Sequence, residues 1–142
     1  MSSAEFDLKG NLLVRARHDS DLIKAITELA EARGITTATF TAIGAVKNAK
    51  LGFYDQVEHK YGEMKIDTHQ EIASCIGNVT LKDGKPFVHA HAVLADENGR
   101  TIAGHLIEAA VFAAEIHLCE LEGTKLERKF DEKTGLSLWK IE

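Results

Sequence analysis

The sequence predicts one α+β domain in which a mostly antiparallel β-sheet is covered by one main helix. Only residues 19–33 repeat their apolar side chains at helical spacing, whereas most of the chain after them is rich in β-branched residues and in alternating apolar and polar residues. The 142 residues are enough for one hydrophobic core, and they include no linker, repeat or low-complexity segment. We therefore expect a single domain over residues 1–142.

The main helix is predicted over residues 19–33. Asp19, Ser20 or Asp21 can cap its first turn, because a side-chain oxygen at that position accepts a hydrogen bond from a free backbone N–H group. Gly34 stands where a left-handed C-terminal cap is expected. The apolar residues that define the helical spacing are Leu22, Ile23, Ile26, Leu29 and Ala30. They would cover one face of the sheet.

Strands are predicted for most of the chain that follows the helix. The expected strands are residues 36–46, 49–55, 71–81, 86–95, 100–107 and 110–123, followed by two shorter ones at 126–131 and 136–141. Short turns are expected at residues 47–48 and 82–85. Segment 110–123 contains several alanines, which also suit a helix, but its alternation of side chains favours a strand.

Residues 96–99, Asp-Glu-Asn-Gly, predict a tight turn between two of these strands. Asp at the first position and Gly at the fourth suit a type I turn followed by a glycine bulge. With residues 97–99 as the loop, His91 lies directly opposite His105. His89 is two residues from His91 and therefore faces the same side of the sheet. A slip of one residue would send His105 to the other face.

Three imidazoles in this register can converge on one metal ion. Three neutral nitrogen ligands with one open position suit Zn²⁺ in a catalytic site, whereas a closed structural site has a fourth protein ligand. Cys75 and Cys119 lack the paired spacing of a zinc knuckle and are interpreted as reduced thiols. The alternative is three unrelated histidines on a polar strand face.

Charge and hydropathy lower the expectation for two classes of partner. The chain has 17 basic and 22 acidic residues, a net charge of −5, which disfavours binding to the phosphates of a nucleic acid. No apolar run is long enough to span a membrane, and the first residues lack the pattern of a secretory signal. With its two isolated cysteines, the chain is therefore expected to be cytoplasmic.

Several segments, in order, resemble a known family. They are "ATFTAIGAVKNAKLGFYD", "EIASCIGNVTLKDGKPFVHAHAVLADENGRTIAGHL", "AAEIHLCELEG" and a C-terminal "LERKFDEKTGLSLW". Over about residues 8–139 the chain resembles the plants-and-prokaryotes-conserved (PPC) domain, also called DUF296. This resemblance implies a mostly antiparallel α/β domain and a homotrimer. In prokaryotic members it also implies a metal at the positions of His89, His91 and His105.

The resemblance also bears on DNA binding and catalysis. In plants the domain is joined to AT-hook motifs that bind DNA, but this chain has no AT-hook, so that activity is not carried over. More distantly, the fold and the histidine arrangement resemble acetolactate decarboxylase and a zinc-dependent ester hydrolase. This analogy of fold raises the expectation that the metal site is catalytic.

Glu71 is the candidate general base, because a carboxylate near a zinc-bound water can accept a proton. The alternative for Glu71 is an exposed carboxylate at a strand end. His117 could also approach the metal, although a surface or core histidine is the simpler interpretation.

Three functions remain open. One is a trimeric zinc protein that acts on a small carbonyl or ester substrate as a hydrolase or decarboxylase. Another is a DNA-binding regulatory module, and the third is a structural or protein-interaction trimer whose metal only stabilises the hairpin.

Overall fold

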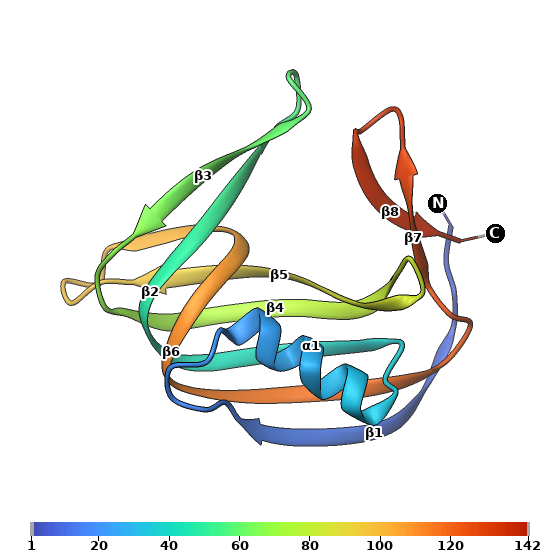
Figure 1. The fold of residues 1–142 in the computed structure, drawn as a ribbon, viewed down its shortest axis with the longest axis horizontal. Coiled ribbons are helices and arrows are strands. Elements are labelled where there is room, and N and C mark those ends of the chain that lie inside the picture. The colour runs from blue at the N-terminus through green and yellow to red at the C-terminus, as the bar shows by residue number, and fades with distance from the viewer. Residues whose placement is uncertain (1, 142) are drawn as a thin grey trace.

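The computed structural model describes residues 2–141 and folds them into one helix and eight strands (Figure 1). In chain order they are β1 (Phe6–Arg15), α1 (Leu22–Arg33), β2 (Ala38–Asp55), β3 (Lys60–Ile66), β4 (Gln70–Lys82), β5 (Lys85–Ala95), β6 (Thr101–Gly123), β7 (Glu127–Asp131) and β8 (Leu136–Lys140). All strand pairs are antiparallel except β4 with β7. The predicted mostly antiparallel sheet with one helix is confirmed. Within the described residues, no helix has the length and apolar character needed to cross a membrane.

Four strands close into a ring. β2 pairs with β6 on one side and with β4 on the other, and β5 connects β4 back to β6. Side chains on the inner side of this ring are buried together, while alternate residues of β4, β5 and β6 point outward. β1 is added next to β6, and the hairpins β2–β3 and β7–β8 extend from the ring (Figure 1).

Helix α1 packs against β5 and β6 and buries Leu22, Ile26 and Ala30 in the common core. Of the three possible caps, Asp21 is the one used: its Oδ1 accepts from the Lys24 N–H at 2.9 Å. Its Oδ2 accepts from the Ala109 N–H at 2.8 Å, which attaches the start of the helix to β6. Gly34 ends the helix in the left-handed conformation at φ 65°, as predicted.

Strand continuity differs from the prediction in two places. The predicted turn at residues 47–48 is wrong: β2 continues through it, and a shift of register between Val46 and Asn48 absorbs the irregularity as a bulge. β6 is likewise one strand where two were predicted. The alanine-rich segment 110–123 is strand, as its alternation indicated.

β1 and β3 were not predicted. Both lie at edges of the sheet and have few buried side chains, so neither sequence carries a strong alternation of apolar and polar residues. β1 also pairs with β6, which lies far away in the sequence, whereas β3 pairs in regular register with its sequence neighbour β2.

The β5–β6 turn has the predicted geometry. The Gly99 N–H donates to the Asp96 carbonyl oxygen at 2.9 Å, the Asp96 N–H donates to the Arg100 carbonyl oxygen at 3.0 Å, and Gly99 has φ 74°. His91 consequently lies opposite His105 in the ladder, as predicted.

Candidate metal centre

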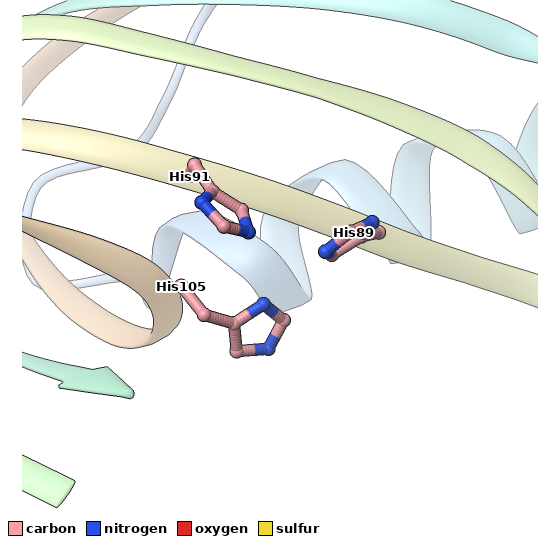
Figure 2. Close-up of side chains that lie close together, drawn as sticks. All are labelled: His89, His91 and His105. Carbon is pink, nitrogen blue, oxygen red and sulfur yellow. The ribbon is translucent and has the colours of Figure 1, made fainter. Parts of the chain in front are cut away.

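Three histidine side chains converge at the end of the β5–β6 ladder that lies away from the turn (Figure 2). β5 supplies His89 and His91, and β6 supplies His105. One ligand nitrogen from each lies within 4.8 Å of the other two, and the ring centroids are 5.1 to 5.6 Å apart. Nitrogens around a tetrahedral ion are about 3.4 Å apart when each metal–nitrogen bond is about 2.1 Å. Small rotations of the rings therefore suffice for all three to hold one ion.

The electrostatic environment keeps two of these imidazoles neutral. Burial lowers the pKa of His89 from 6.5 to about 4, and the charge of Arg128 and the neighbouring imidazoles act in the same direction. Burial, followed by the charges of His91 and Arg128, also lowers the pKa of His105. A neutral imidazole has a free lone pair, which is the form that binds a metal.

His105 provides an independent sign that a ligand belongs here. Its Nδ1 is buried and has no hydrogen-bond partner among the described residues. Figure 2 shows this nitrogen, which is bonded to the ring carbon that carries the side chain, on the side of the ring that faces His89 and His91. Buried polar atoms nearly always have a partner, and a metal ion between the three rings would supply one.

Two of the three histidines, His89 and His105, border a pocket of about 280 Å³. β7–β8 contributes Arg128 and residues 135–138, β3 contributes Tyr61, and the ring contributes Lys82 and Phe87 together with His89 and His105. The two hairpins are joined here, because the Tyr54 hydroxyl donates to the Thr134 carbonyl oxygen at 2.6 Å. The ring of Tyr61 lies against that of His105, with centroids 5.2 Å apart. The three-histidine cluster thus adjoins a half-open, partly aromatic pocket.

Glu71 is not brought to the three histidines. It lies opposite Ala95, four residues along β5 from His91, which corresponds to about 13 Å of strand. It borders a different pocket together with His69. The position suits the alternative interpretation of Glu71 as a carboxylate near a strand end.

His117 also lies outside the cluster. Its Nε2 is 3.2 Å from Asn11 Oδ1 and 3.6 Å from Cys119 Sγ. Conversely, sequence analysis did not identify Tyr61, Lys82 or Arg128 as site residues. Each is a common residue type on a different strand, and no spacing in the sequence connects it to the histidines.

The lowered pKa values predict that the metal-free protein loses stability in mild acid. In the unfolded chain His89 binds a proton near pH 6.5, but in the folded chain only near pH 4. Between these values the unfolded state binds more protons, so the free energy of unfolding falls as the pH falls. Urea unfolding in the presence of a chelator, at several pH values in this window, measures the effect. The slope against pH should be smaller in His89→Gln, and an identical slope would contradict the prediction.

The fold and the site together define a class of protein: a curled antiparallel sheet domain that presents a three-histidine centre beside a small pocket. Comparison with known families is consistent with this class. The model of the Plants and Prokaryotes Conserved domain matches residues 5–122. The chain belongs to this family, which confirms the resemblance seen in the sequence.

Solved structures of similar proteins extend the comparison. A metal-containing protein from Archaeoglobus fulgidus is 42% identical, with a TM-score of 0.95 over 98% of this chain and 99% of that one. A plant- and prokaryote-conserved protein from Pyrococcus horikoshii is also 42% identical, with a TM-score of 0.94 over 99% of this chain and 97% of that one. A protein from Bacteroides thetaiotaomicron, provisionally named a DNA-binding protein, is 20% identical, with a TM-score of 0.87 over 99% and 98% of the two chains. No curated protein sequence matches the chain.

The expected likeness to acetolactate decarboxylase is present at the level of fold. The enzyme from Bacillus subtilis superposes with a TM-score of 0.53 at 11% identity, over 94% of this chain and 61% of that one. At this identity the similarity concerns the sheet and its connections and does not transfer an activity.

Proposed function

We propose that this protein binds one divalent transition metal ion, Zn²⁺ in the first instance, through His89, His91 and His105, and that the ion serves a small-molecule site. The observation that carries the proposal is the convergence of three imidazoles, two with lowered pKa values, at the edge of a pocket. All-nitrogen sites with three protein ligands are typical of catalytic zinc. The similar Archaeoglobus fulgidus protein is described as metal-containing, which supports the same assignment.

The ion would supply a Lewis acid for the oxygen of a carbonyl or ester ligand. The chain supplies the surroundings. Tyr61, whose pKa is raised by burial, stays protonated and can donate a hydrogen bond into the pocket. Phe87 forms an apolar part of the wall, which limits the entry of water. These features favour a hydrolase or decarboxylase type of reaction over a purely structural role for the metal.

The direct test is the metal content of untagged protein after zinc addition and dialysis. About one zinc per chain supports the proposal. Protein that retains no zinc would overturn it and leave the histidines as an unmetallated strand surface. A closed structural site would retain zinc but would not bind a small metal-binding probe such as acetohydroxamic acid.

We further propose that the protein is a homotrimer, the state that the family resemblance implies. The ladder aligns Leu13, His117, Thr41, Ile76 and His91 in one row across five strands of the outer face. Leu13 is 87% exposed and Ile76 is 63% exposed in the single chain. Further copies of the chain would bury these apolar side chains. Because Ile76 lies opposite His91, such an interface would adjoin the metal centre.

We expect Leu13→Glu to convert the trimer into smaller species, because a carboxylate would then be buried at the interface. Light scattering coupled to size-exclusion chromatography gives the mass. Val57→Glu is the matched control, since Val57 is equally exposed but lies in the β2–β3 turn. Wild-type protein that elutes as a monomer would contradict the trimer, and equal effects of both substitutions would place the interface elsewhere.

DNA binding is favoured only by the names of similar structures. The excess of acidic over basic residues opposes it. We expect no retention of a duplex at physiological salt, with or without zinc, in a filter-binding or gel-shift measurement. Retention that weakens steeply as salt is added would overturn this expectation and support the regulatory alternative.

A further inference from the structure

Arg128 is a buried cation without an acidic partner. Its side chain on β7 is only 7% exposed. Nε donates to Thr80 Oγ1 at 3.0 Å, Nη1 to the Ser137 carbonyl oxygen at 3.1 Å, and Nη2 to Asn78 Oδ1 at 2.9 Å. All three acceptors are neutral, and no Asp or Glu of residues 2–141 forms an ion pair with it. A guanidinium has five N–H donors, so two remain available for a ligand.

The surroundings hold this guanidinium in place beside the metal centre. Its central carbon lies 5.4 Å from the ring centroid of Phe87 and 5.5 Å from that of Trp139. Arg128 lines the same pocket as His89 and His105, and its charge is close enough to lower the pKa of both imidazoles, where burial is the larger cause. The side chain is therefore fixed by packing and borders the space where a metal ligand would lie.

The pocket is positively charged although the whole chain is negative. Lys82 also lines it, with Nζ 5.3 Å from the ring centroid of Phe87. No Asp or Glu in the described part of the chain contributes to the lining. The net charge of the whole chain is −5, so a pocket with two cations and no carboxylate differs in sign from the rest of the protein. A buried cation that lacks an anion in the free protein is best explained by a ligand that provides one.

We propose that the pocket binds a small organic acid, whose carboxylate pairs with Arg128 and Lys82 while a second oxygen-bearing group reaches the three-histidine centre. This inference rests on the proposed metal function and specifies its ligand class. The planar guanidinium matches the two oxygens of a carboxylate. Lys82 is the ladder partner of Arg128 on β4 and adds a second positive charge next to it. A volume of about 280 Å³ suits a ligand of a few heavy atoms.

A purely structural role for Arg128 is the competing explanation, because its hydrogen bonds connect β7 and β8 to β4. Lys82 separates the two explanations. It forms no ion pair among the described residues, and its side chain is partly exposed, so its replacement should leave the fold intact. A loss of anion affinity in Lys82→Gln therefore reports on charge in the pocket and not on folding.

The test compares two metal-binding probes on the zinc-loaded protein by calorimetry. Acetohydroxamic acid carries no ionisable group besides the hydroxamate that binds the metal, and succinic monohydroxamic acid is its analogue with an added carboxylate. We expect the carboxylated probe to bind at least about tenfold more tightly to the wild type. Arg128→Gln should remove this advantage and Lys82→Gln should reduce it, while the affinity for acetohydroxamate stays within about twofold. Circular dichroism and thermal melting establish that each variant is folded.

The outcomes separate this inference from the proposed function. Equal affinity of the two probes for wild-type protein would overturn the organic-acid site and leave the metal site standing. If the carboxylated probe still binds more tightly in both variants, Arg128 and Lys82 are not the residues that hold its carboxylate. If neither probe binds, the proposal of an accessible metal site is wrong. Binding of succinate to the metal-free protein then tests the anion-binding pocket by itself. Succinate binding that is weakened in Lys82→Gln would sustain the pocket. No succinate binding, or binding that is unchanged in that variant, would overturn it.

Discussion

Replacement of His105 or His91 by alanine is expected to abolish zinc retention. Each residue supplies one of only three protein ligands, and the remaining two cannot enclose the ion. Loss of a residue that merely supports a ligand typically costs about 10- to 100-fold in metal affinity, so loss of a ligand should cost at least about 100-fold. Elemental analysis after zinc addition and dialysis should give about one zinc per wild-type chain and close to none in either variant.

His117→Ala is the matched control for this prediction. His117 lies on β6, as His105 does, but it does not belong to the cluster. It should retain zinc as the wild type does. Zinc that persists in His105→Ala, or that is lost equally in His117→Ala, would contradict the assignment. We expect His105→Ala to fold, because the imidazole ring is only partly buried. Its removal breaks no hydrogen bond within the described structure.

Gly44→Ala is expected to destabilise the fold severely, although it adds only one methyl group. Gly44 lies at φ 134°, where a residue with a Cβ atom is strained. An added Cβ would also lie 2.1 Å from the Ala113 carbonyl oxygen, on the neighbouring strand β6. Strain and backbone overlap together should cost about 3 kcal/mol or more. Urea unfolding measures this cost directly.

Gly62→Ala provides the comparison for Gly44→Ala. It lies on β3 at an ordinary backbone conformation, and the nearest atom to an added Cβ is the Phe53 carbonyl oxygen at 3.8 Å. We expect a change in unfolding free energy within about 0.5 kcal/mol, as for most surface substitutions. Similar losses in both variants would show that the close approach of β2 and β6 at Gly44 is not what limits stability.

Local patterns predicted the parts of the fold that depend on nearby residues. The helix repeat and its glycine cap placed α1 within a few residues, because caps and periodicity act within one or two turns. The errors arose where pairing depends on distant strands. The bulge in β2 near Val46 and Asn48 reflects its fit to β6, and the edge strands β1 and β3 carry little apolar pattern of their own.

The family and the convergence of the three histidines were accessible to sequence analysis, whereas the distance of Glu71 from them was not. Glu71 is near His69 in the sequence, but the antiparallel register puts it beside Ala95, far along β5 from the histidines. The candidate general base therefore had no local signal that could locate it relative to the ligands. The trimer and the identity of the metal stay predictions, to be decided by the measurements described above.

The sequence by itself determined that three histidines face one another. The Asp96–Gly99 turn sets the register of a tight hairpin, and the two-residue period of a strand then places His89, His91 and His105 on one side. Only the tertiary structure decided what surrounds them. Tyr61, Lys82 and Arg128 reach the pocket because the sheet closes on itself and carries two hairpins to its rim, and such contacts between distant strands depend on the packing of the whole core.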